Sequence, residues 1–124
     1  MHTESFYAYC MEKLGAEACF PFDETTLVFK VGGKMFALAS LDTEQLRVNL
    51  KCDPERAIEL RASWSGILPA WHMNKKHWIS VYINAGISDA LIVSLMQDSY
   101  SLVYSTIPKK DISGLQQDSR TLNI

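Results

Sequence analysis

The chain has 124 residues, of which 48% are hydrophobic and 21% are charged, the composition of one globular domain with a single core. Its apolar runs are too short to span a membrane, and the opening residues MHTESF lack the basic start and apolar stretch of a secretory signal. The three cysteines form no CxxC pair, which is typical of free thiols in a reducing compartment. We therefore expect a cytoplasmic protein with no membrane partner.

The first segment with a helical pattern is TESFYAYCMEKLG, residues 3–15. Thr3 is placed to cap this helix, and Gly15 can adopt the left-handed conformation that commonly ends one. Apolar residues recur at helical spacing and form one stripe, which consists of Phe6, Tyr7, Cys10, Met11 and Leu14. The pattern therefore predicts an amphipathic first helix.

The period changes to two between residues 20 and 51, which predicts a run of antiparallel strands. FPF at 20–22 is expected as a short edge strand, because Pro21 cannot donate a hydrogen bond to a neighbouring strand. TLVFKV and KMFALASL flank Gly32–Gly33, which is the pattern of a two-residue hairpin turn. LRVNLK alternates strictly and is predicted to place Leu46, Val48 and Leu50 inward and Arg47, Asn49 and Lys51 outward.

Two more helices and another strand follow. Residues 53–66 have Asp53 at the N-cap, Pro54 at the first helical position and Gly66 as the expected stop. HWISVYI, residues 77–83, alternates like a strand, and a last helix is expected from Ser88 to Pro108.

The order of helix, strands, helix, strand and helix predicts an α+β fold, an antiparallel sheet with helices packed on one face. The other face of such a sheet can lie in water. We expect a single domain over residues 1–115 and a polar tail over residues 116–124.

The densest chemistry lies in PAWHMNKKHWISV, residues 69–81. His72 and His77 are five residues apart, whereas two metal ligands need a spacing of three or four on a helix and an even spacing on a strand. A cysteine such as Cys52 could meet one of these histidines, but the sequence offers no third group to orient the pair. We therefore predict no metal, no cofactor and no catalytic residue, and a hydrolase or redox enzyme that uses Cys52 is the least favoured interpretation.

Nucleic acid fits the local composition better. No acidic residue occurs between Glu59 and Asp89, although the net charge of the chain is −2. In this window Lys75 and Lys76 are residues of the type that contacts phosphate, and Asn74 can donate hydrogen bonds. We expect weak DNA binding through a basic loop and strand surface formed by Lys34, Arg47, Lys51, Asn74, Lys75 and Lys76. Outward lysines also keep any sheet soluble, so the pattern alone does not decide the matter.

The alternative is a module that binds a protein or a small ligand. The loop would then pack on the sheet and frame a pocket, with Trp71, His72, His77 and Trp78 as its anchors. Buried His and Trp side chains around a concavity would favour a ligand, and exposed lysines on a continuous positive face would favour DNA.

Three segments carry a family resemblance: FPFDETTLVFKVGGKMFALASLD, VNLKCDP and PAWHMNKKHWISV. Together they resemble the MmcQ/YjbR-like family of small bacterial proteins, from about Phe20 to Lys110, with Ala70–Trp71 where members often have Gly-Tyr. The resemblance implies a frataxin-like (CyaY-like) fold and DNA binding through a "double wing", with no established enzyme activity. The wings would correspond to Lys30–Lys34 and Trp71–Trp78. The acidic ridge of iron-binding frataxins has no counterpart here, so iron chemistry does not follow from the fold.

Overall fold

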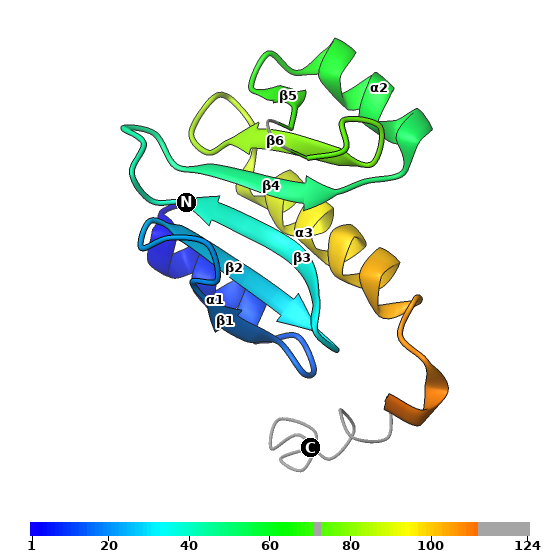
Figure 1. The fold of residues 1–124 in the computed structure, drawn as a ribbon. Helices are drawn as coiled ribbons and strands as arrows, with labels where there is room; N and C mark the ends of the chain where they lie inside the picture. The colour runs from blue at the N-terminus through cyan, green and yellow to red at the C-terminus, as the bar shows by residue number, and fades with distance from the viewer. Residues whose placement is uncertain (71–72, 112–124) are drawn as a thin grey trace.

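The computed structural model describes residues 1–70 and 73–111, and these residues form an α+β fold with a six-stranded antiparallel sheet (Figure 1). The strands run in the spatial order β1-β2-β3-β4-β6-β5. The helices are α1 (Thr3–Met11), α2 (Pro54–Ser63) and α3 (Asp89–Tyr104). The strands are β1 (Glu17–Cys19), β2 (Thr26–Val31), β3 (Lys34–Ser40), β4 (Arg47–Lys51), β5 (Ile67–Pro69) and β6 (Trp78–Tyr82).

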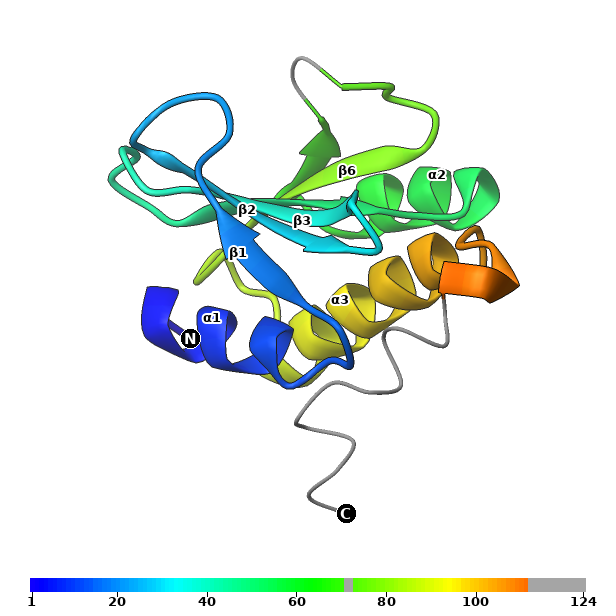
Figure 2. The same cartoon turned by 60° about the horizontal axis from the view of Figure 1, so that its bottom comes forward.

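Helices α1 and α3 cover one face of the sheet (Figure 2). Helix α2 connects β4 to β5 in the chain and packs against β5. The core lies between this face and the two helices, as the alternation of the strands predicts. Val48 and Leu50, both predicted to face inward, are confirmed as core residues, and alternate apolar residues of β2 and of the β6 segment lie in the same core, namely Leu27, Phe29, Val31, Ile79, Val81 and Ile83. Leu46, also predicted to face inward, is half-buried and packs against the core.

A buried hydroxyl joins α3 to the centre of the sheet. The Ser99 side chain is completely buried, and its Oγ accepts a hydrogen bond from the backbone N–H of Lys51 at 2.8 Å. The same hydroxyl donates to the backbone oxygen of Phe36. Phe36 is the residue of β3 that is skipped in the pairing opposite the register shift between Phe29 and Lys30, so the Ser99 hydroxyl satisfies a backbone oxygen at a place where the strand pairing is irregular.

The turn and cap predictions are largely confirmed. Gly32 and Gly33 both have positive φ and join β2 to β3, so the hairpin turn has the backbone that glycine favours. Asp53 caps α2 with Pro54 directly after it, and the side chain of Ser88 accepts the N–H of Leu91 at the start of α3.

Other boundaries differ from prediction. His2, rather than Thr3, caps α1, because the His2 ring accepts the N–H of Ser5. The FPF segment is not a strand; the edge strand is β1, which precedes it. Gly66 does not stop α2, which ends at Ser63 with an extended Trp64, and α3 ends four residues before Pro108. Strand β5 was not predicted, because three residues carry too little periodicity.

The predicted tail at residues 116–124 lies outside the described residues. Within residues 1–70 and 73–111, every helix is too short or too polar to cross a bilayer.

Candidate functional site

A tight turn holds the two lysines of the 73–77 segment at the surface. The Asn74 side-chain oxygen accepts the backbone N–H of Lys76 at 2.9 Å, and the Asn74 backbone oxygen accepts the N–H groups of His77 and Trp78 at 3.1 and 2.9 Å. Asparagine is a common turn residue because its side chain can bond to backbone two residues ahead. Asn74, Lys75 and Lys76 are all exposed, so this turn presents two cations to solvent.

A third cation, Arg61, reaches the same turn from the last turn of α2. Its guanidinium donates a long hydrogen bond of 3.4 Å to the backbone oxygen of Lys75. We name the group of Arg61, Lys75 and Lys76 the basic corner. The sequence places Arg61 in the same acid-free window, but the contact depends on how α2 packs on the sheet and could not be read from spacing.

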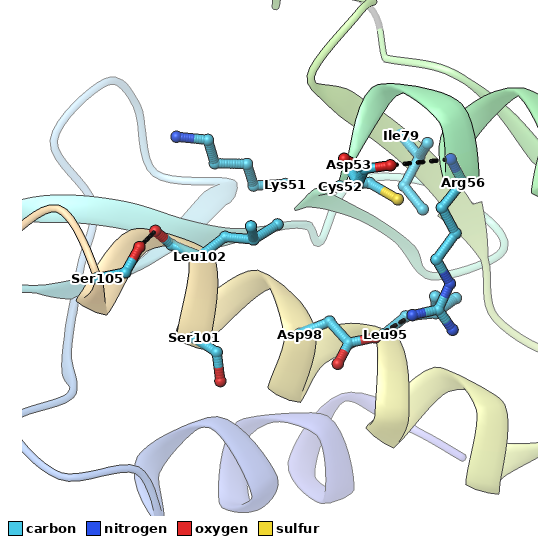
Figure 3. Close-up of a pocket in the computed structure, with 10 residues that line it drawn as sticks. All are labelled: Lys51, Cys52, Asp53, Arg56, Ile79, Leu95, Asp98, Ser101, Leu102 and Ser105. Atoms are coloured by element: carbon cyan, nitrogen blue, oxygen red, sulfur yellow. Dashed lines mark hydrogen bonds and ion pairs between the residues drawn. The ribbon is translucent and has the colours of Figure 1, made fainter.

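The turn is fastened to the end of β4. The backbone N–H of Cys52 donates to the oxygen of His77 at 2.8 Å, and Lys51 lies opposite Trp78 in the strand register. Lys51 therefore adjoins the basic corner, although it also lines a pocket beside α3 (Figure 3).

Two predicted members of the basic surface do not join the basic corner. The Lys34 amine donates to the hydroxyl and backbone oxygen of Thr106, at 3.0 and 3.3 Å, and is therefore turned toward the end of α3. Arg47 is at the opposite end of β4 from Lys51, which at about 3.3 Å per residue is roughly 13 Å away. Its guanidinium donates to Ser40 Oγ at 3.0 Å. The expected single basic surface is thus divided.

Two of the four predicted loop anchors lie among the described residues. His77 and Trp78 are half-buried, whereas Trp71 and His72 lie outside the described residues. Asn49, predicted to face outward, does lie on the face away from the helices, but it is half-buried there. Its oxygen accepts the Ser80 hydroxyl at 2.6 Å, and its amide nitrogen contacts the Met73 sulfur at 3.5 Å. Met73 therefore packs on this face.

On the helix side, a pocket of about 390 Å³ lies between the end of β4, the start of α2 and α3 (Figure 3). Its apolar surface comes from Cys52, Ile79, Leu95 and Leu102. Arg56 and Asp98 form an ion pair across it, which satisfies both charges within the protein. Burial raises the pKa of the Cys52 thiol, so the group stays protonated at neutral pH and is a poor nucleophile.

Metal-ligand side chains do not gather in the described part of the chain: no group of three or more His, Cys, Asp or Glu residues there could hold an ion. Cys10, Cys19 and Cys52 are free cysteines, and two of them, Cys10 and Cys52, are buried. Cys19, the third, is half-buried.

Comparison with known proteins identifies the family. The YjbR family matches residues 11–102. The chain is 44% identical to the uncharacterized protein YbdF of Escherichia coli O157:H7 over 77% of the chain and 78% of YbdF. It is 34% identical to the uncharacterized protein YjbR of Escherichia coli K12 over 89% of the chain and 93% of YjbR.

Solved structures agree with this match. The crystal structure of Deinococcus radiodurans protein DR2400 superposes with a TM-score of 0.85 and 36% identity, over 93% of this chain and 88% of that one. A crystal structure of a Pseudomonas syringae protein gives a TM-score of 0.73 with 31% identity, over 83% of this chain and 99% of that one. The chain therefore belongs to the YjbR family.

Proposed function

We propose that the protein binds duplex DNA weakly, without catalysis, through the basic corner. The observation that carries the proposal is the fixed turn at residues 73–77, which presents Lys75 and Lys76 at the surface with Arg61 beside them. Lysine and arginine contacts to phosphate supply most non-specific DNA affinity. In this proposal the three cations contact successive phosphates, Lys51 adds to the positive field, and Asn74 keeps the turn in shape.

The strand register supports the "double wing" arrangement in part. The β2–β3 hairpin and the 73–77 turn both lie at the end of the sheet where β4 finishes. However, the Lys34 amine is bound to Thr106, so this proposal gives the hairpin backbone, rather than Lys34, the role of the second wing. The proposal also includes a cytoplasmic location, where DNA and reduced thiols occur together.

The expected affinity is low and sensitive to salt. For about three phosphate contacts, the affinity should fall about 40-fold between 50 and 200 mM salt, because each contact releases close to one counterion. Glu55 and Glu59 on α2 are exposed on the same helix as Arg61 and weaken the local positive field. Fluorescence anisotropy with a labelled duplex of random sequence at these two salt concentrations measures this slope.

A charge reversal tests the location. Lys75→Glu/Lys76→Glu should abolish the anisotropy change at low salt. The matched control is Lys109→Glu/Lys110→Glu, an exposed lysine pair of the same spacing beyond the end of α3, which should retain most of the binding. Equal losses in both variants would mean that the affinity for DNA depends only on the net charge of the protein, which would refute the location. No binding by the wild type at low salt would refute the function.

A further inference from the structure

A second cavity lies on the face of the sheet that the helices leave uncovered. It has a volume of about 340 Å³. Figure 2 shows the segment between β1 and β2 rising above this face on one side, and residues 73–77 rising on the other. Its apolar walls are Phe22, Met35, Leu38 and Met73, and we name it the open-face pocket. Small-molecule sites are typically concave, of this size, and mostly apolar with a few placed polar groups.

The strand register lines up polar side chains across the pocket floor. Thr26 of β2 lies opposite Ser40 of β3, and Ser40 lies opposite Arg47 of β4. All three line the pocket, so a guanidinium and two hydroxyls occupy one row perpendicular to the strands. This row is distinct from the basic corner, which lies at the other end of β4.

Not every hydrogen-bond donor of the Arg47 guanidinium has a partner in this pocket. Its terminal nitrogen donates to Ser40 Oγ, but Nε is buried and has no hydrogen-bond partner among the described residues. A buried donor without a partner is costly, and an arginine carries five donors in a fixed fork. The bidentate partner of that fork is a carboxylate or a phosphate.

The charge of the lining favours the carboxylate. Asp23 also lines the pocket, and its carboxylate accepts the backbone N–H groups of Thr25 and Thr26 at 2.9 and 2.7 Å. These backbone hydrogen bonds lower the pKa of Asp23, so it is ionised at neutral pH. One positive and one negative group then border the cavity, which disfavours a dianion such as a phosphate monoester.

We propose that the open-face pocket binds a small monocarboxylate with an apolar body. The carboxylate pairs with the Arg47 fork, and the apolar body packs between Leu38, Met35 and Met73 below the exposed ring of Phe22. Methionine side chains adapt to differently shaped apolar groups, so the pocket accepts a class of ligands. Asn49 holds the Met73 wall in place through its amide contact with the sulfur.

The test uses phenylacetate as the probe, with phenylacetamide as its neutral isostere. In a nitrogen–proton NMR titration of the whole chain, phenylacetate should shift the Arg47 Nε–H signal and the backbone signals of Ser40 and Thr26, with a Kd on the order of 1 mM. Phenylacetamide should bind at least tenfold more weakly. Phenyl phosphate should also bind more weakly than phenylacetate; tighter binding would refute the assignment to carboxylates.

Two arginine variants test whether the probe binds in the open-face pocket. Arg47→Gln should weaken phenylacetate binding at least tenfold, whereas Arg61→Gln, a half-buried arginine of the basic corner, should leave it unchanged. If Arg47→Gln does not fold, the comparison of phenylacetate with its amide still decides the proposal in the wild type. Saturable shifts that map away from β2–β4, or no saturable shift up to about 10 mM probe, would overturn it. Neither result bears on DNA binding, which uses other residues.

Discussion

The two faces of the sheet are built from the same strands but obey different rules. On the helix-covered face, alternate strand residues are apolar and pack into one continuous core under α1 and α3. On the other face, Val28, Leu38 and Ser80 are also buried, although α1, α2 and α3 do not cover this face. Residues 20–25, before β2, and residues 73–77, before β6, border this second face (Figure 2). The polar side chains of the proposed open-face pocket therefore lie where loops, rather than helices, border the sheet.

The first prediction compares two adjacent residues of β2 that lie on opposite faces of the sheet. Phe29→Ala should lower the free energy of unfolding by about 3–5 kcal/mol, because Phe29 is fully buried under the helices. Its ring lies 5.9 Å from that of Phe6 and 6.2 Å from that of Phe36, between centroids. Val28→Ala, on the open face, should cost only about 2 kcal/mol, the transfer energy of the deleted carbons. Urea denaturation measures both, and equal losses would show that the loops cover their face as well as the helices do.

The second prediction concerns the polar link on the helix-covered face. Ser99→Ala should lower the unfolding free energy by about 2 kcal/mol, because the N–H of Lys51 and the oxygen of Phe36 would lose a buried partner. Ser101→Ala, an exposed position on the same helix, should change it by less than about 0.5 kcal/mol. Similar values for the two variants would mean that water replaces the Ser99 hydroxyl.

The helix-covered face is the part of the fold that the sequence predicts well. Strand alternation identified its residues, and local chemistry identified the Gly32–Gly33 turn and the caps at Asp53 and Ser88. The α+β class followed, since a regular apolar pattern needs a second layer to cover it. These features depend on neighbours in sequence or on one period, which is why they can be read without coordinates.

The candidate sites are predicted less completely, because they depend on contacts between distant segments. Alternation placed Arg47 and Asn49 on the outward face, but not the loops that half-bury them there. The exposure of Lys75 and Lys76 agrees with the sequence, whereas the contact of Arg61 with their turn and of Lys34 with Thr106 required the tertiary structure. The same residue pattern thus predicted a single basic surface where the fold makes two separate polar regions.

The third prediction concerns the hydrogen bond between Ser80 and Asn49 on the open face. Ser80→Ala removes the donor that Asn49 accepts at 2.6 Å and should lower the unfolding free energy by about 1 kcal/mol, half the effect at Ser99. A double-mutant cycle with Asn49→Ala isolates the coupling between the two side chains. The absence of coupling would mean that this side-chain hydrogen bond adds nothing to the pairing of β4 with β6.

The smallest expected effect is a pH dependence at the rim of the open-face pocket. Backbone hydrogen bonds from Thr25 and Thr26 lower the pKa of Asp23 in the folded state. The stabilising contribution is therefore present above the unfolded-state pKa of about 3.9 and is lost as the pH falls through the lower pKa of the folded state. The urea midpoint of the wild type should exceed that of Asp23→Asn at about pH 6 and approach it near about pH 2. A difference that stayed constant with pH would assign Asp23 a role independent of its charge. The negative charge of Asp23 would then no longer explain why the pocket disfavours dianions.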